Sequence, residues 1–289
     1  MIKLDGGLST ALERLGANLK TILWTGDLIA ATPHLIEQAH LDFIKAGAAI
    51  ITTASYQISF IGEQTSGLQD TEVSNLLRAS TKIAQSAREK AIDLGHTSSI
   101  KVAASIGPYG AALGDGSEYR GHYGVSETVL RDFHLRRIAI LLESQPDLFA
   151  VETIPSIIEA QIVQEILMEM KVPYWISFSC KDEKAISEGD SFAEAISSLQ
   201  RDKNLIAAGV NCSNPSFIAS LLESVNQKSK PEFIVYPNLG RSWDAKKKVW
   251  IGEAVQFQEV IPSWQKLGAK YIGGCCGVGP AELSEINLN

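Results

Sequence analysis

The apolar residues of this chain alternate between short β-branched runs and longer stretches with helical spacing, separated by glycine-rich or polar breaks. The short runs predict eight strands, at Ile2–Leu4, Ala49–Thr53, Lys101–Ile106, Leu148–Glu152, Tyr174–Ser179, Ala207–Asn211, Phe233–Pro237 and Tyr271–Gly274. The longer stretches predict helices at Pro33–Ala46, Ser74–Leu94, Ser126–Ser144, Ile157–Met170, Ser191–Arg201, Pro215–Val225 and Gln256–Leu267.

Strands that alternate with helices pair in parallel through right-handed crossovers. Eight such units in 289 residues fit an α/β fold of the closed (β/α)8 TIM-barrel type. An open, doubly wound sheet is the alternative, but no GxGxxG fingerprint follows the first predicted strand. Because no Pro- or Ser-rich linker divides the chain, we expect one barrel domain spanning residues 1–289.

Charge and composition argue against some classes of binding partner. The chain has 26 Lys+Arg against 33 Asp+Glu, a net charge of −7, which argues against binding the phosphates of nucleic acids. It lacks both an apolar run long enough to span a bilayer and, in MIKLDGG, the apolar core of a signal peptide. Four cysteines fit a reducing compartment. We expect a cytoplasmic protein acting on small molecules, without a membrane or nucleic-acid partner; its oligomeric state stays open.

The functional residues of such barrels lie where the strands end and the following loops begin. In this chain those positions hold most of the unusual polar and sulfur residues. They are Asp5-Gly6-Gly7, TASYQ (53–57), GPYG (107–110), Glu152-Thr153, Cys180, Asn211-Cys212, Tyr236-Pro237-Asn238 and Gly273-Gly274-Cys275-Cys276-Gly277. All of this chemistry is therefore predicted on one rim of the barrel.

The cysteines of this rim suggest a metal site. Neighbouring side chains of a regular strand point to opposite faces, but the glycines around Cys275 and Cys276 allow the backbone to bend and aim both thiols at one point. Cys212 ends a strand only one strand away in the barrel. Three thiolates with one exchangeable position are typical of a catalytic zinc site. A strained vicinal disulfide is the redox alternative; Cys180 is a possible fourth ligand, although packing is the simpler interpretation for a single cysteine.

At this point the chain resembles the homocysteine S-methyltransferases, over nearly its whole length. The most specific part is Gly209-Val210-Asn211-Cys212 together with the Gly-Gly-Cys-Cys-Gly end. The segments TASYQ, GPYGAALGDGSEYRGHY (107–123) and VYPNLG (235–240) resemble the branch that uses S-methylmethionine or S-adenosylmethionine. The resemblance implies a barrel with one zinc ion that makes methionine from homocysteine.

The resemblance also implies roles for individual residues. The zinc ligands and catalytic centre would be Cys212, Cys275 and Cys276, and the homocysteine site would include Asp5, Thr53 and Glu152. Two departures are visible. The betaine-using branch has a tyrosine where this chain has Thr153, and a threonine-rich stretch is replaced by Val278-Gly279-Pro280.

Other contacts are predicted from chemistry. Asp5 and Glu152 suit the substrate ammonium, and backbone N–H groups near Gly6, Gly7 or Thr53 suit its carboxylate. Asn211 is expected to orient Cys212 through a hydrogen bond.

The loop after the third strand is expected to face the methyl donor. Its Tyr109, Tyr119 and Tyr123 rings can hold a sulfonium by cation–π attraction, and Asp115 and Glu118 can meet its charge. Packing and solvation are the simpler interpretations of these five residues.

The chemistry needs a thiolate, because a thiol is a poor nucleophile near neutral pH. A coordinated thiol loses its proton, so a zinc ion replaces a general base, and the negative cluster attracts a sulfonium donor. Two other functions stay open: a redox or metal-sensing protein that uses the vicinal cysteines without turnover, and an enzyme with betaine or a folate as donor. The sequence does not choose between the two sulfonium donors, or between homocysteine and selenocysteine as acceptor.

Overall fold

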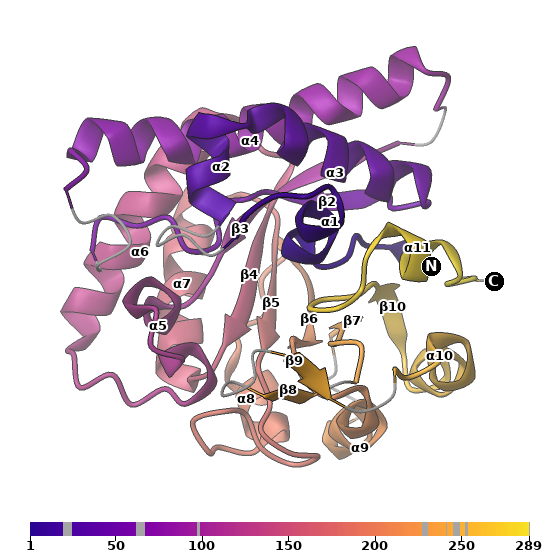
Figure 1. Cartoon of the computed structure of the whole chain (residues 1–289). Coiled ribbons are helices and arrows are strands. Elements are labelled where there is room, and N and C mark those ends of the chain that lie inside the picture. Colours follow the sequence, from indigo (N-terminus) through magenta and orange to yellow (C-terminus); the bar gives the residue numbers. More distant parts are fainter. Residues whose placement is uncertain are drawn as a thin grey trace.

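The computed structural model describes residues 1–19, 25–61, 67–96, 99–226, 231–240, 242–244, 249–251 and 254–288. Strands occupy the centre of the molecule and helices surround them, with the N- and C-termini on the same side (Figure 1). None of the described helices combines the length and apolar composition needed to cross a membrane.

Eight parallel strands form the central sheet, and all eight predicted strands are confirmed. They are β1 (Ile2–Lys3), β2 (Ile50–Thr52), β3 (Lys101–Ile106), β4 (Leu148–Ile154), β5 (Tyr174–Phe178), β6 (Leu205–Asn211), β7 (Phe233–Tyr236) and β10 (Ala269–Ile272). Their order in the sheet is β1-β10-β7-β6-β5-β4-β3-β2.

The two outer strands of that order meet and close the barrel. Leu4, directly after β1, forms a parallel bridge with Ile50 of β2. The N–H of Ala49 donates to the carbonyl of Lys3 at 2.8 Å, and the N–H of Asp5 donates to that of Ile50 at 3.1 Å. The architecture is therefore the predicted (β/α)8 barrel and not an open sheet.

The predicted helices are also present, with small shifts at their ends. They are α3 (Pro33–Lys45), α4 (Asp70–Asp93), α6 (Glu127–Glu143), α7 (Ile157–Met170), α8 (Phe192–Ser198), α9 (Ile218–Ser224) and α10 (Phe257–Lys266). The start of α4 was predicted four residues too late. Gln69 precedes the helix, and its N–H donates to the Glu72 side chain at 2.7 Å in a capping box that extends the helix to Asp70.

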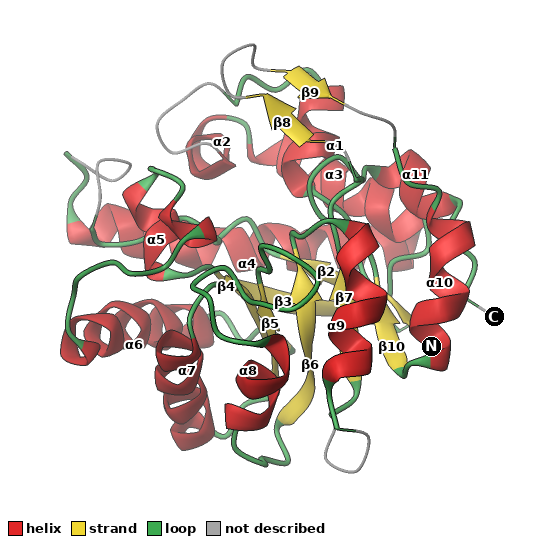
Figure 2. Cartoon of the chain, turned by 90° about the horizontal axis from the view of Figure 1, so that it is seen from below, coloured by secondary structure: helices red, strands yellow, loops and turns green. Residues whose placement is uncertain are grey.

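The structure adds short elements that the apolar spacing did not predict. They are α1 (Leu8–Arg14), α2 (Thr25–Ala31), α5 (Tyr109–Leu113), α11 (Pro280–Ser284), the 3-10 turns η2 (Ser117–Tyr119) and η3 (Pro215–Phe217), and the strands β8 (Ser242–Asp244) and β9 (Val249–Ile251). β8 and β9 form a separate antiparallel hairpin outside the barrel sheet (Figure 2). The run Lys246-Lys247-Lys248, predicted as a solvated turn, lies outside the described residues.

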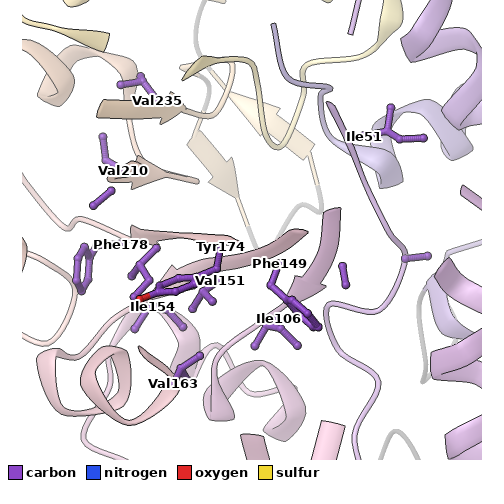
Figure 3. Packing of buried hydrophobic residues seen from close by; sticks show 14 of the residues in the cluster. Ile51, Ile106, Phe149, Val151, Ile154, Val163, Tyr174, Phe178, Val210 and Val235 are labelled. Carbon is purple, nitrogen blue, oxygen red and sulfur yellow. The ribbon is translucent and has the colours of Figure 1, made fainter. Parts of the chain in front are cut away.

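The strands divide the core into two layers because successive side chains point to opposite faces. One set faces the helices and packs with them, as Figure 3 shows for Phe149, Val151 and Val163. The other set comes almost entirely from strands and fills the barrel, with Ala150 and the fully buried Trp175 among its members.

The inward-facing set changes from apolar to polar toward the carboxyl ends of the strands. On five strands a polar residue follows an apolar inward-facing one by two positions: Thr52 after Ile50, Ser105 after Ala103, Glu152 after Ala150, Ser177 after Trp175 and Tyr236 after Ile234. The alternation of the strands thus fills the bottom of the barrel with apolar side chains and lines its mouth with polar ones.

Candidate active site

Three cysteines converge at the mouth of the barrel. The Sγ atoms of Cys212, Cys275 and Cys276 all lie within 4.8 Å of one another. Cys212 Sγ lies 3.7 Å from Cys276 Sγ, and the two vicinal sulfurs lie 4.0 Å apart. All four cysteines of the chain are free, so the vicinal pair forms no disulfide. We call these three residues the three-cysteine cluster.

The spacing of the sulfurs fits a tetrahedral zinc site. Ligands placed tetrahedrally at about 2.3 Å from one ion lie about 3.8 Å from each other. The measured separations of 3.7 and 4.0 Å are close to that value. Three thiolates leave one position of the tetrahedron for another ligand, which is the arrangement of catalytic zinc sites. The residues therefore fit the predicted ion.

The backbone around Cys275 explains how two adjacent cysteines reach one point. The Cys275 N–H donates to the carbonyl of Pro237 at 2.8 Å, and its own carbonyl accepts from Val278 at 3.0 Å in a turn closed by Gly277 at φ 85°. A Cβ on Gly273 would lie 2.6 Å from the Asp5 carbonyl oxygen. The glycines thus allow both the bend and the close packing of this segment, as predicted.

Cys212 reaches the cluster from a strained backbone. It has φ 47°, in the left-handed region that non-glycine residues rarely adopt, and its N–H donates to the Tyr236 carbonyl at 3.2 Å. Three residues earlier, a Cβ on Gly209 would lie 2.0 Å from the carbonyl oxygen of Ile234, so β6 and β7 pack closely here. Such strain persists only where the surroundings hold it, and it is common at functional sites.

Cys180 lies apart from the cluster. Among the described residues, the group able to hold a metal contains the three-cysteine cluster and no fourth cysteine. Cys180 is buried in the apolar core, and burial raises the pKa of its thiol. The packing interpretation of Cys180 is therefore correct, and the possibility of a fourth cysteine ligand is not supported.

The three thiols of the cluster have different pKa values. Hydrogen bonds from the thiols of Cys212 and Cys275 lower the pKa of Cys276 well below its usual value. Hydrogen bonds to the other two sulfurs, followed by burial, raise the pKa of Cys275. The bond from Cys275 lowers the pKa of Cys212, but its own bond to Cys276, burial and the charge on Cys276 together raise it. Without a cation the cluster therefore favours one thiolate, and a cation is needed to hold three thiolates together.

Two carboxyl groups, those of Asp5 and Glu152, lie at the barrel mouth. Asp5 is 4% exposed and accepts from the Thr52 N–H at 2.6 Å, and Glu152 accepts from the Ser105 hydroxyl. Burial raises the pKa of Asp5 to about 8 and that of Glu152 to about 7. The charges that act on them are acidic, Glu152 on Asp5 and Cys212 on Glu152. In the described part of the chain, neither carboxyl group is therefore matched with a basic side chain.

Thr52, the residue before the predicted site residue Thr53, is the threonine that contacts Asp5. Thr52 faces inward and its hydroxyl donates to the carboxylate at 2.9 Å. Thr53 points the other way, where its hydroxyl pairs with Ser55 at 2.7 Å and accepts from the Ser105 N–H at 3.0 Å. The backbone N–H of Thr53 donates to the Ala103 carbonyl. The structure therefore places Thr53 as a support for the loop after β2.

The N–H groups suggested for the substrate carboxylate are partly used already. That of Gly7 donates to the Val278 carbonyl at 2.8 Å, and that of Thr53 is engaged in the sheet. Gly6 is packed so closely that a Cβ would lie 2.3 Å from the Val278 oxygen. Of the three N–H groups suggested from the sequence, that of Gly6 is therefore the candidate for the substrate carboxylate.

Asn211 supports the site through Thr153 and not through the sulfur of Cys212. Its amide donates to the Thr153 hydroxyl at 2.8 Å, and its carbonyl oxygen accepts from the Thr153 N–H at 2.7 Å and from the Ser177 hydroxyl at 2.9 Å. Thr153 has φ 61° and replaces the tyrosine expected from the betaine branch. Asn211 therefore fixes the ends of β4 and β6 relative to each other.

The tyrosines of the loop after β3 divide into two groups. The Tyr119 hydroxyl lies 3.1 Å from Cys212 Sγ, so Tyr119 contacts the cluster. Tyr109 is buried, with its ring 5.3 Å from that of Tyr123 and 5.1 Å from that of Phe133. The Tyr123 hydroxyl donates to Glu159 at 3.1 Å. Of the three predicted tyrosines, only Tyr119 is placed beside the cluster, and the other two pack.

Two further tyrosines lie at this mouth, at rim positions that the sequence identified without giving these tyrosines a role. Tyr56, in the TASYQ segment, hydrogen-bonds Thr153, and its hydroxyl is close enough to Glu118 and Cys212 for their charges to raise its pKa. Tyr236 lies beside Glu152 and pairs with the Ser177 hydroxyl at 2.6 Å. Tyr236 could have been found from the strand alternation, since it follows the inward-facing Ile234 by two residues.

A cavity of about 380 Å³ opens on the cluster beside Cys276. Its other walls come from α1, α11 and the loop after β7, and include Glu13 and Leu239. Arg14 of α1 and Glu282 of α11 pair across it at 2.7 Å. Its volume is in the range of small-molecule sites.

The chain was compared with known proteins. The family model described as homocysteine S-methyltransferase matches residues 2–288. "Homocysteine S-methyltransferase 1" of Arabidopsis thaliana is 41% identical over 297 residues, covering 98% of this chain and 91% of that protein. "Homocysteine S-methyltransferase YbgG" of Bacillus subtilis is 41% identical over 293 residues, covering 99% and 93%. The crystal structure of the metallated homocysteine methyltransferase MmuM from Escherichia coli has a TM-score of 0.89 at 33% identity, covering 99% of this chain and 94% of that one.

Proposed function

The chain belongs to the homocysteine S-methyltransferase family, and we propose that it moves a methyl group from a sulfonium donor to the thiol of L-homocysteine, with one zinc ion held by Cys212, Cys275 and Cys276. The product would be methionine. The observation that carries the proposal is the convergence of three sulfurs from two distant segments at the mouth of the barrel. We further propose that residues 1–289 form a single barrel domain and that the enzyme works in the cytoplasm, where free thiols persist.

The three-cysteine cluster would activate the nucleophile, the thiol of homocysteine, through the zinc ion that it holds. Zinc, when bound, supplies a Lewis acid that lowers the pKa of the homocysteine thiol and so replaces a general base. The three cysteinates hold the ion and keep the site electron-rich. Because burial and mutual repulsion oppose three thiolates in the absence of a cation, the chain's own electrostatics favour metal binding.

The homocysteine ammonium is assigned to Asp5 and Glu152. Asp5 is buried and Glu152 is half-buried, and both are held in place by hydroxyl donors, Thr52 and Ser105. Their raised pKa values reflect burial of a charge without a partner, and an ammonium would supply that partner. The Gly6 N–H is assigned to the substrate carboxylate.

The donor is assigned to the side of the cluster where Tyr56 and Tyr119 lie. A sulfonium ion is attracted to aromatic faces and to negative charge, and both tyrosines, Glu118 and Cys212 act on each other electrostatically here. In the reaction, a lone pair of the homocysteine thiolate forms the new S–CH3 bond while the donor's S–CH3 bond breaks, and its electron pair returns to the donor sulfur. The positive charge of the donor disappears, so a site that excludes water assists the step.

We name S-methylmethionine and S-adenosylmethionine as donors because the segments at 53–57, 107–123 and 235–240 resemble the branch that uses them. Purified protein should be incubated with homocysteine and either sulfonium donor, or with betaine, and methionine measured. Methionine from a sulfonium donor and none from betaine supports the proposal. Reversible disulfide formation between Cys275 and Cys276, with no methionine from any donor, would support the metal- or redox-sensing alternative instead.

A further inference from the structure

Helix α6 contains a fully buried arginine that the proposed chemistry does not use. The side chain of Arg137 has 0% exposure. Its four hydrogen bonds all end on backbone carbonyl oxygens: Nε donates to Ile58 at 2.8 Å, Nη1 to Gly107 at 2.9 Å, and Nη2 to Tyr56 at 2.8 Å and to Ser55 at 3.3 Å. The guanidinium also stacks on the Phe133 ring at 4.8 Å.

These carbonyls belong to two different loops of the barrel mouth. Three of them lie in the loop after β2, and the Gly107 carbonyl begins the loop after β3. A planar guanidinium with five fixed donors can join several carbonyls, whereas an ammonium on a flexible stem cannot hold the same set. Burial lowers the pKa of Arg137 to about 10, so it still carries its charge at neutral pH. A buried cation whose hydrogen bonds all end on backbone carbonyl oxygens suggests a requirement for specific geometry, since an apolar side chain would be easier to bury.

Tyr56 is the link between Arg137 and the three-cysteine cluster. On one side, Arg137 holds its carbonyl oxygen. On the other side, Gly107 packs so tightly that a Cβ there would lie 2.6 Å from the Tyr56 carbonyl oxygen and 2.7 Å from its ring. Burial and the charges of Glu118 and Cys212 raise the pKa of the Tyr56 hydroxyl, so the end of the ring lies on the side of the cluster where the Tyr119 hydroxyl contacts Cys212 Sγ at 3.1 Å. Arg137 and Gly107 therefore fix the backbone and the ring of a tyrosine whose tip lies at the site.

A second buried group holds the neighbouring loop in the same way. Glu159 of α7 is fully buried and accepts from the Tyr109 N–H at 2.6 Å, the Tyr123 hydroxyl at 3.1 Å and the His134 ring at 2.8 Å. Its charge acts favourably on Arg137. The loops that carry Tyr56 and Tyr119 are thus both anchored from behind, by helices that do not reach the cluster.

We propose that Arg137 is a positioning residue for the methyl donor: by holding the carbonyls of Ser55, Tyr56, Ile58 and Gly107, it sets where the Tyr56 ring lies beside the three-cysteine cluster. This inference rests on the proposed function, in which Tyr56 contacts the sulfonium. Arg137 touches no reacting atom, so its effect should appear in the handling of the donor and not in the binding of the metal or of homocysteine.

The test uses Arg137→Met and Arg137→Lys in the full chain, with Arg131→Met as the matched control. Arg131 lies on the same helix but its side chain is 35% exposed and pairs with Glu165 and Glu169 on the surface. For each variant, zinc content, kcat, and the KM values for homocysteine and for S-methylmethionine are measured. We expect both Arg137 variants to raise the donor KM at least tenfold, with zinc content and homocysteine KM within twofold of the wild type, because small misplacement of a contacting group has large effects. Arg131→Met should match the wild type.

Coupling to Tyr56 separates positioning from a general structural role. In a Tyr56→Ala background, Arg137→Met should change the donor KM by less than threefold, because the group that it positions is gone. A full, undiminished effect in that background would overturn the proposal. So would a fall in kcat that follows the fraction of folded protein while both KM values stay constant.

Gly107→Ala provides the same test if the Arg137 variants do not fold. It displaces Tyr56 from the opposite side and leaves Arg137 in place, so it should also raise the donor KM selectively; an unchanged donor KM in folded Gly107→Ala protein would overturn the proposal. Wild-type protein that makes no methionine from homocysteine with either S-methylmethionine or S-adenosylmethionine would overturn the proposed function, and this inference with it. An active wild type with unaffected Arg137 variants would overturn only this inference.

Discussion

Replacing Glu152 by glutamine tests the assignment of the homocysteine ammonium. Glu152→Gln keeps the shape of the side chain and an oxygen for the Ser105 hydroxyl, but removes the negative charge. Burial raises the pKa of Glu152 from 4.5 to about 7, and at about 1.4 kcal/mol per pKa unit this means that holding the charge without a cation costs about 3 kcal/mol. A substrate ammonium should recover much of that free energy.

A hydrogen bond to a charged group contributes about 1.5–3 kcal/mol, so loss of the charge should raise the homocysteine KM by a factor of about 10 to 150. The donor KM should change less than threefold. Initial rates of methionine formation at varied concentrations of each substrate give both values. The control is Glu165→Gln on the exposed face of α7, where the carboxylate pairs with Arg131 at 3.0 Å. An unchanged homocysteine KM, or an equal rise in both KM values, would refute the assignment.

Three further predictions concern metal binding and stability. Cys180→Ala should keep the zinc content and activity of the wild type by metal analysis, since Cys180 lies outside the three-cysteine cluster; loss of zinc would contradict this. Gly209→Ala should lower the free energy of urea unfolding by about 3 kcal/mol, because the new Cβ would lie 2.0 Å from the Ile234 oxygen; an unchanged midpoint would contradict the tight β6–β7 packing. His40 is fully buried, neither of its ring nitrogens has a hydrogen-bond partner among the residues that the structure describes, and burial lowers its pKa from 6.5 to about 4. The unfolded chain therefore binds the proton first, and stability present above pH 6.5 should fall by up to about 3 kcal/mol as the pH drops to 4, a dependence that His40→Leu should reduce.

Much of the barrel was predictable because its strands have a residue pattern that is recognisable in the sequence. Runs such as Lys101–Ile106 are short, rich in apolar residues and bounded by turns, and their alternation with long helical stretches leaves few topologies. The short elements were not predictable in this way. Helices of five to seven residues such as α5 and α11 contain too few turns to show a helical period.

The candidate site was predictable where chemistry and strand ends coincide, as in the three-cysteine cluster. The site was not predictable where a residue's role depends on which face of its strand the side chain occupies. Thr52 and Thr53 are adjacent and chemically equal, and only the register of β2 shows that Thr52 faces Asp5. Tyr109 and Tyr119 share one loop, and only the fold of that loop sends Tyr119 to Cys212.

Supporting residues were the hardest to predict because they lie far from the chemistry in the sequence. Arg137 looks like one more charged residue of α6, among Arg131 and Arg136, whose side chains are 35% and 47% exposed. Arg137 is buried because two loops, after β2 and after β3, pack against the helix at this position. The spacing of residues within α6 does not indicate such a contact. His134 of the same helix also has a supporting role, since its buried ring pairs with Glu159 at 2.8 Å.

The most direct test of the central claim is zinc K-edge X-ray absorption on the purified protein, with metal content measured in parallel on Cys212→Ala. The account predicts one zinc per chain with three sulfur ligands at about 2.3 Å, a fourth sulfur on addition of homocysteine, and loss of the metal in the variant. A zinc ion with four sulfur ligands before homocysteine is added, or a Cys212→Ala protein that retains its zinc, would contradict the account.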